Sequence, residues 1–207
     1  MLDVPGHARS ARTAASARRP LFFALATLAA SCTVLLASVD AAARTASRPR
    51  ASGSVALDED AAHAFVADVD NQALHEITLP SGEVRSLALP CAPEQVLILE
   101  DQRLAVTLRG CDRVAIVDRR TLETLATASV APDPWGLAQT SSGELLVTSA
   151  FGRTLTALDG RTLAPHWAVG TAREPRSITL SPDGTHAWIT HLVGSSLSVV
   201  DLASEAH

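Results

Sequence analysis

The chain has 207 residues, of which 47% are hydrophobic and 19% are charged, a composition that is ordinary for a globular protein. From residue 51 onward it carries 10 arginines against 20 acidic residues. This acidic body argues against a nucleic-acid partner and against adsorption to an anionic membrane surface.

Residues 1–43 are predicted to form an export signal. A polar, basic stretch precedes an apolar run at 21–39, and three alanines at 41–43 form a small-residue cleavage pattern. Two alternatives remain open, an uncleaved membrane anchor and a lipoprotein signal at Cys32. The two arginines just before the run also resemble a twin-arginine signal. Each version exports the rest of the chain, to the periplasm or to the cell surface.

After an Ala-, Arg- and Ser-rich stretch at 44–54, which is predicted to be a linker, the chain repeats a unit of about forty residues. Four tetrapeptides recur, and their second residues are separated by 40, 41 and 42 positions. A proline column and an aspartate column keep nearly the same period. The tetrapeptides are Phe65-Val66-Ala67-Asp68, Ala105-Val106-Thr107-Leu108, Leu146-Val147-Thr148-Ser149 and Trp188-Ile189-Thr190-His191, and the columns are Pro93, Pro134, Pro175 and Asp118, Asp159, Asp201.

This period, with β-branched runs between turn residues, is typical of the four-stranded blade of a β-propeller. The sequence therefore predicts an all-β fold of four antiparallel blades, at about 55–92, 93–133, 134–174 and 175–207. In the third copy the strands are expected at 136–139, 145–149, 154–158 and 164–169. Tight hairpins are expected at Ser142-Gly143, Asp183-Gly184, Asp159-Gly160 and Ser81-Gly82.

One column of the repeat predicts little chemistry. The first position of the second strand holds two histidines, one arginine and one glutamate, which have no reaction or ligand in common. We interpret this column as a solvent-exposed rim. Its members are His63, Arg103, Glu144 and His186.

The best copy, running from the Ser181-Pro182-Asp183-Gly184 turn through the fourth tetrapeptide to Asp201, resembles the YVTN β-propeller repeat family. That resemblance implies a ring of seven or so blades, whereas the fourth copy stops after its third strand. We therefore expect the chain to be a fragment of a longer protein. Propellers of this kind serve as binding scaffolds in surface-layer and periplasmic proteins and as modules beside cytochrome domains, so the resemblance implies a fold more sharply than a function.

Cys91 and Cys111 are predicted to form a disulfide. Both belong to the exported part, where conditions are oxidising, and the repeat places both in loops on the same face. The alternative is two unpaired thiols in neighbouring loops.

Four residues are candidates for a binding face. Trp135 and Arg176 occupy equivalent positions just after a blade-entry proline, and Arg173 lies in the loop beside them. His191 ends the second strand of the fourth copy. The alternatives are packing between blades for the tryptophan and a turn role for the histidine.

The sequence has no haem-attachment motif, no nucleophile elbow and no His/Cys pair at metal-ligand spacing, so we expect no catalytic residue, metal or cofactor. It predicts an exported, non-catalytic scaffold that binds a protein, a peptide or a cell-envelope glycan. It would contact a membrane only through its N-terminal segment, if that segment is not cleaved. The alternative is the N-terminal propeller of a larger periplasmic oxidoreductase or cytochrome-type electron-transfer protein. Whether that protein is an enzyme stays open.

Overall fold

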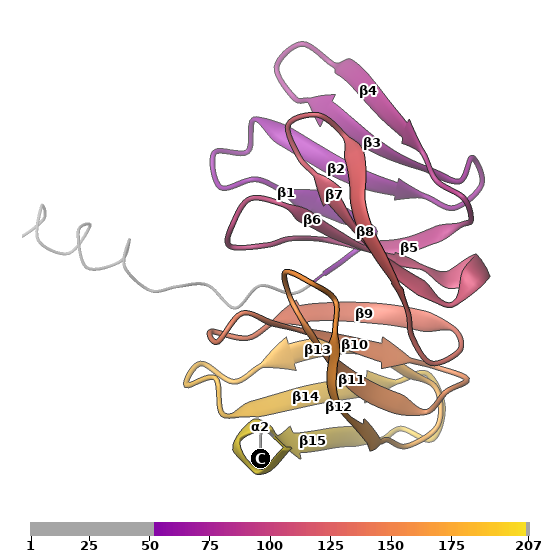
Figure 1. The fold of residues 1–207 in the computed structure, drawn as a ribbon, viewed down its shortest axis with the longest axis vertical. Helices are drawn as coiled ribbons and strands as arrows, with labels where there is room; N and C mark the ends of the chain where they lie inside the picture. Colours follow the sequence, from indigo (N-terminus) through magenta and orange to yellow (C-terminus); the bar gives the residue numbers. More distant parts are fainter. Residues whose placement is uncertain (1–51, 206–207) are drawn as a thin grey trace, which may run out of the picture. The chain divides into compact units, whose positions relative to one another are not determined.

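The computed structural model describes residues 52–205, nearly all of which lie in or between antiparallel β-strands (Figure 1). Three sheets have four strands and the last has three, and within each sheet every strand pairs with the next in the chain. The blades are β1 (Val55–Leu57), β2 (His63–Asp68), β3 (Ala73–Thr78), β4 (Glu83–Ala88); β5 (Pro93–Ile98), β6 (Leu104–Leu108), β7 (Arg113–Asp118), β8 (Glu123–Ser129); β9 (Pro134–Gln139), β10 (Glu144–Ser149), β11 (Thr154–Asp159), β12 (Pro165–Gly170); and β13 (Pro175–Leu180), β14 (His186–His191), β15 (Leu197–Asp201). A 3-10 turn, η1 (Arg109–Cys111), follows β6, and a single helical turn, α2 (Leu202–Glu205), follows β15.

The prediction of an all-β fold built from propeller blades is confirmed, and the strands expected in the third copy agree with β9 to β12 within two residues. The predicted signal or anchor at 1–43 lies outside the described residues. Among the residues that the structure describes, no helix is long and apolar enough to cross a membrane.

Burial along the second strands reflects how many neighbouring blades each has. In β6 every residue is buried, because the second blade has a neighbour on each side. In β14 burial alternates, with Ala187 and Ile189 buried and Trp188 and Thr190 exposed. Successive side chains of a strand point to opposite faces of the sheet, so one face of the fourth blade is covered and the other is not.

The hydrophobic core is divided into three layers, one between each pair of consecutive blades. The first layer joins Phe65 and Leu74 to side chains of β5 to β7, and the second joins Ile116 to Leu145 and Leu158. The third joins blades three and four. A blade cannot bury its own apolar faces, so the stack rather than the single sheet is the unit of stability.

The threonine of the tetrapeptide ties the second blade to the third and the third blade to the fourth. The Thr107 hydroxyl accepts a hydrogen bond from the Gln95 N–H at 3.0 Å and donates one to the carbonyl of Trp135, in the next blade, at 3.0 Å. Thr148 repeats this one blade later, with a donated bond of 2.6 Å to the Arg176 carbonyl. These two hydroxyls therefore fix the backbone of two candidate site residues.

The predicted hairpin glycines are only partly used as expected. Gly82, Gly143 and Gly184 have positive φ values of 71°, 89° and 71°, which suits tight turns. The turn after Asp159 is different, because its left-handed residue is Leu163, at φ 61°. Gly160 is required instead by a close approach, since a Cβ atom there would lie 2.2 Å from the Gly143 carbonyl oxygen.

The described end of the expected linker, residues 52–54, is attached to the blades. Gly53 forms a two-residue bridge with Val96 of β5. The Ser52 N–H donates to the carbonyl of Leu137 in β9 at 3.1 Å, and its hydroxyl accepts the Leu137 N–H at 2.7 Å. The first strand of each blade has no strand paired with its inner edge. Residues 52 and 53 supply hydrogen-bond partners for the inner edges of two first strands, β5 and β9. The segment therefore pairs with the blades here, where a linker was expected.

Candidate functional site

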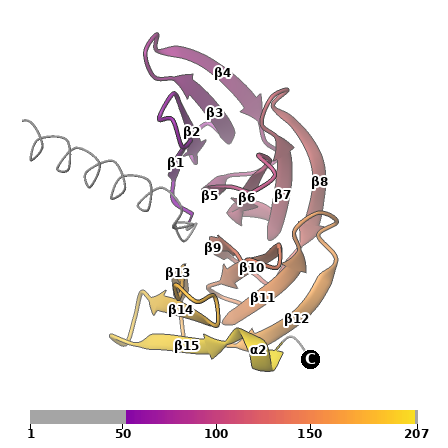
Figure 2. The same ribbon diagram turned by 90° about the vertical axis from the view of Figure 1, so that its left-hand side faces the viewer.

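The candidate site lies where the first strands of successive blades begin. Figure 2 shows β4, β8 and β12 on the outer side, with the first strands at the opposite edge of each sheet. The links between blades and the turns between second and third strands share one end of the sheets, which we call the entry face. The other turns share the opposite face. Glu94, Trp135 and Arg176 hold equivalent positions on the entry face, each just after the blade-entry proline.

Trp135 lies between two guanidinium groups. The Arg176 guanidinium carbon lies 3.9 Å from the centre of the indole ring, and that of Arg109 lies 4.7 Å from it. Arg109 comes from the second blade and Arg176 from the fourth, the two blades that flank the blade of Trp135. Guanidinium groups are attracted to the electron-rich faces of an indole, so this stack joins three blades.

Asp133 holds the stack together. Its carboxylate accepts hydrogen bonds from the Arg109 Nε and, at 3.2 Å, from the Trp135 Nε1, and it lies 3.6 Å from an Arg176 nitrogen. Its own N–H donates to the Asp112 carboxylate at 2.8 Å. Asp133 adopts a positive φ of 62°, which aspartate tolerates better than most residues do. Its side chain is only 6% exposed, so this carboxylate orients the two arginines rather than facing solvent.

Two further carboxylates complete the charge pattern. Glu174 accepts a hydrogen bond from Arg176 at 2.7 Å, and Glu94 lies 3.6 Å from Arg109. Burial raises the pKa of Glu94, and the neighbouring Arg109 only partly offsets that effect. The Arg109 side chain, at 40% exposed, is the most accessible charged group of the cluster.

The structure joins Cys91 and Cys111 in a disulfide, with their Cα atoms 6.0 Å apart. Cys91 lies in the link that leads into β5, and Cys111 ends the 3-10 turn that begins at Arg109. The bond therefore connects the interblade link to a turn of the second blade itself, and it restricts the backbone on which Arg109 and Glu94 sit.

The other two candidate residues form a separate pair. Both ring nitrogens of His191 are engaged, Nδ1 with the Arg173 carbonyl at 2.9 Å and Nε2 with the Ser198 hydroxyl at 2.8 Å. The histidine, at the end of β14, thus connects β15 to the loop before β13. The Arg173 side chain is exposed and lines a shallow pocket of about 360 Å³ together with Arg153.

Sequence reasoning found Trp135 and Arg176 but missed Arg109, Asp133 and Glu94. Asp133 had a readable signal, because the residues before the blade-entry prolines form a column that contains Asp133 and Glu174. Arg109 had none, since its contact with Trp135 arises only when the blades stack.

The rim column is more structured than expected. His63 faces Glu76 with 3.4 Å between the nearest nitrogen and oxygen, and His166 bonds Glu144 at 2.8 Å. Arg103 donates to the Gly160 carbonyl of the next blade at 2.8 Å. Two members, His63 and Arg103, line a pocket on the opposite face. The sequence prediction of a rim without common chemistry overlooked this shared location.

The entry-face cluster is suited to recognition. It presents one partly exposed guanidinium, that of Arg109, beside an indole ring, and every charged group of the cluster has an oppositely charged neighbour. Within residues 52–205 no group of three or more His, Cys, Asp and Glu side chains is arranged to hold a metal ion.

No protein-family model and no curated protein matches the chain. Solved structures do match it. Hydrazine synthase of Kuenenia stuttgartiensis is similar with a TM-score of 0.67 and 18% identity, over 72% of this chain and 46% of that chain. Virginiamycin B lyase of Staphylococcus aureus gives 0.63 and 13%, over 73% and 53%. The periplasmic gluconolactonase of Pseudomonas aeruginosa gives 0.63 and 17%, over 71% and 48%.

The chain thus spans about half the length of the solved propellers that it matches. At these identities the likeness concerns the fold alone. Together with the four consecutive antiparallel sheets, it shows that this chain has the β-propeller fold.

Proposed function

We propose that the exported part of the chain is a YVTN-type propeller scaffold that binds a protein or peptide partner through its entry face, without catalysis of its own. The observation that carries this proposal is the stack of Arg109, Trp135 and Arg176 across three blades. Tryptophan and arginine contribute a disproportionate share of the binding energy at protein interfaces, especially where they are held rigidly.

The geometry favours a peptide carboxylate over a glycan. A sugar ring usually binds tryptophan by lying on a free face of the indole, and here guanidinium groups from the two flanking blades cover the ring. The outward group is instead the Arg109 guanidinium, which is 40% exposed although it is paired with Asp133 and Glu94. Arginine binds carboxylates through paired, charge-assisted hydrogen bonds. The preferred partner therefore carries an acidic side chain or a free C-terminal carboxylate.

Two observations support the family and the location. The four tetrapeptides fall in the second strand of all four blades, in β2, β6, β10 and β14, the position that the YVTN resemblance implies. Export is supported by the predicted signal and by the likeness to a gluconolactonase that is periplasmic.

A second candidate function is that these blades form the propeller part of a larger enzyme of the cell envelope. It is favoured by the likeness to a synthase, a lyase and a lactonase whose chains are about twice as long as the matched part. In that case the entry face would recognise a substrate instead of a partner protein.

The test is to select binding peptides from a random peptide-display library with the exported protein as the target. The selected peptides are then synthesised, and their affinities for the protein are measured. We expect the selected peptides to be rich in Asp and Glu. They should bind the Arg109→Gln variant about tenfold more weakly, which is the usual loss for one charge-assisted contact. Arg113→Gln is the matched control, because Arg113 is also exposed and begins β7 just after the same turn. Selected peptides without acidic residues, or an equal loss of affinity in both variants, would contradict the proposal.

A further inference from the structure

The shallow pocket of about 360 Å³ on the entry face lies between the third and fourth blades. Three segments line it, namely the β10–β11 turn, the link from β12 to β13 and the β14–β15 turn. A hollow of this size can hold a small molecule. The described residues that line it are Arg153, Ala172, Arg173, Val193, Gly194 and Ser196.

Hydrogen bonds hold these three segments in place. The Thr171 N–H donates to the Arg153 carbonyl at 2.8 Å, which joins the link to the β10–β11 turn. His191, at the end of β14, forms a bond of 2.9 Å between its Nδ1 atom and the Arg173 carbonyl. A ligand therefore does not have to order the backbone of the pocket, and this lowers the entropic cost of binding.

Two arginines give the pocket a positive charge that its own lining does not offset. The side chains of Arg153 and Arg173 are exposed, and neither guanidinium has a hydrogen bond or an ion pair with any of residues 52–205. None of the described residues that line the pocket is acidic. The neighbouring Glu174 accepts a hydrogen bond from Arg176 at 2.7 Å and is thus engaged elsewhere. Both guanidinium groups remain available to an oxyanion, which arginine binds through charge-assisted hydrogen bonds.

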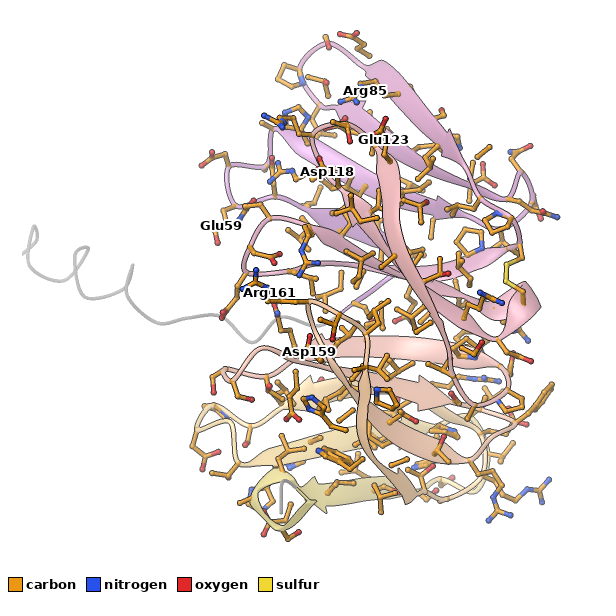
Figure 3. The ribbon with its side chains drawn as sticks, in the orientation of Figure 1. Glu59, Arg85, Asp118, Glu123, Asp159 and Arg161 are labelled. Carbon is orange, nitrogen blue, oxygen red and sulfur yellow. A yellow bond between two sulfur atoms is a disulfide. The ribbon has the colours of Figure 1, made fainter. Side chains whose placement is uncertain are left out.

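The acidic residues of the chain lie mostly on the opposite face, away from this pocket. In Figure 3 Glu59, Asp118 and Asp159 lie towards the left of the molecule, and the yellow disulfide of the entry face lies on the right. An anion that approaches the entry face is therefore repelled less than the net charge of the chain suggests. Turns of the opposite face carry further acids, namely Asp58, Asp60, Glu100, Asp101 and Asp183.

The remainder of the lining is largely apolar. Ala172, Val193 and Gly194 bring no polar side chain, and Ser196 brings the single hydroxyl group of the described lining. Val193 and the adjacent Leu192 are large apolar side chains that stay exposed to solvent. A bare inorganic ion would leave this surface in water, whereas an apolar group attached to the ion would cover it.

We propose that this pocket binds an amphiphilic anion, a carboxylate or phosphate group carried on a short apolar chain. Arg153 and Arg173 bind the anionic group, and Ala172 and Val193 contact the chain. The pocket shares no residue with the arginine–tryptophan stack, so this inference goes beyond the function proposed above and does not depend on it.

Isothermal titration of the exported protein at low salt tests this site with four probes, hexanoate, hexyl phosphate, acetate and 1-hexanol. We expect hexanoate, hexyl phosphate or both to bind, and the tighter of the two identifies the anionic group. Acetate and hexanol should bind at least about tenfold more weakly, because each lacks one of the two parts that the pocket contacts. Raising the salt concentration should weaken the binding of the charged probes.

Arg153→Gln and Arg173→Gln should each weaken the binding of the charged hexyl probe about tenfold, the loss expected for one charge-assisted contact. Arg113→Gln is the matched control, because Arg113 is also exposed on the entry face but does not line this pocket. It should leave binding unchanged. Circular dichroism checks that each variant folds.

The inference is overturned if neither charged hexyl probe binds, if acetate binds as tightly as hexanoate, or if hexanol binds as tightly as the charged hexyl probes. It is also overturned if neither Arg153→Gln nor Arg173→Gln weakens binding more than Arg113→Gln does. The peptide selection with Arg109→Gln tests the arginine–tryptophan stack separately, so either proposal can fail without the other.

Discussion

The threonine of the repeated tetrapeptide is the residue that most directly converts sequence into propeller structure. Its hydroxyl bridges the N–H of its own blade's first strand and a carbonyl of the next blade. The first blade has Ala67 at this position, and there the Ala67 N–H bonds the Ser54 carbonyl instead. Gly136 shows how close the blades come, since a Cβ atom there would lie 2.3 Å from the Arg176 carbonyl oxygen.

Replacing Thr148 by valine should therefore destabilise the protein. The change keeps the shape of the side chain but leaves the Arg176 carbonyl and the Gly136 N–H without their shared partner in a site that is fully buried. The free energy of unfolding should fall by about 1–3 kcal/mol, measured by urea denaturation. Thr124→Val, at an exposed position of β8, should change it by less than about 0.5 kcal/mol. Equal effects of the two changes would contradict the bridging role.

At this scale the sequence predicted residues whose role follows from the repeat and missed those whose role follows from stacking. Trp135 and Arg176 could be found because they share a column after the blade-entry proline. Arg109 could not, because a 3-10 turn aims it at the next blade. His191 was expected to serve a turn or a ligand, and its two ring nitrogens bond the neighbouring loop and strand.

Among the elements, the turn that begins at Ser181 shows how the repeat encodes its hairpins. The Asp183 carboxylate accepts hydrogen bonds from the Ser181 hydroxyl at 2.5 Å and from the Thr185 N–H at 3.1 Å. Gly184 supplies the left-handed conformation that the turn requires. These features can be read from the sequence, because turn chemistry is local. The left-handed conformation of Leu163 was not expected, although Leu122 adopts the same conformation at the equivalent position of the second blade, at φ 55°.

The pKa of Asp183 should be about 2 in the folded protein. The Ser181 hydroxyl, and then the N–H and hydroxyl of Thr185, donate to the ionised carboxylate and stabilise it. A lowered folded-state pKa means that this contribution to stability is present above the unfolded-state pKa of about 3.9 and is lost as the pH falls towards 2. Carbon-13 NMR titration of the side-chain carboxyl measures the midpoint. A midpoint near 3.9 would show that the turn is not formed in solution.

On the scale of the whole molecule, the four blades leave both end faces uncovered. The fourth blade exposes Trp188 at 47%, with Leu197 and Val199 each at 57%. The first blade exposes Leu57 at 56% and Val84 at 54%. In the inner blades the equivalent surfaces form the three core layers.

These end faces should make the exported protein associate with itself. Contiguous apolar surface beside an unpaired strand edge favours contacts between molecules. We expect light scattering coupled to gel filtration to detect species larger than a monomer at micromolar concentration. Replacing Trp188 and Val199 together by threonine, a polar residue that still favours strands, should shift the distribution towards the monomer.

Leu125→Thr is the control for that experiment, because Leu125 is also 54% exposed but lies on β8, away from both end blades. It should leave the association unchanged. A monomeric unmodified protein would mean that its end faces are covered within one molecule, as by further blades or by the segment before residue 52. Equal shifts from Leu125→Thr and from the double replacement would mean that general surface hydrophobicity, and not the uncovered blade face, drives the association.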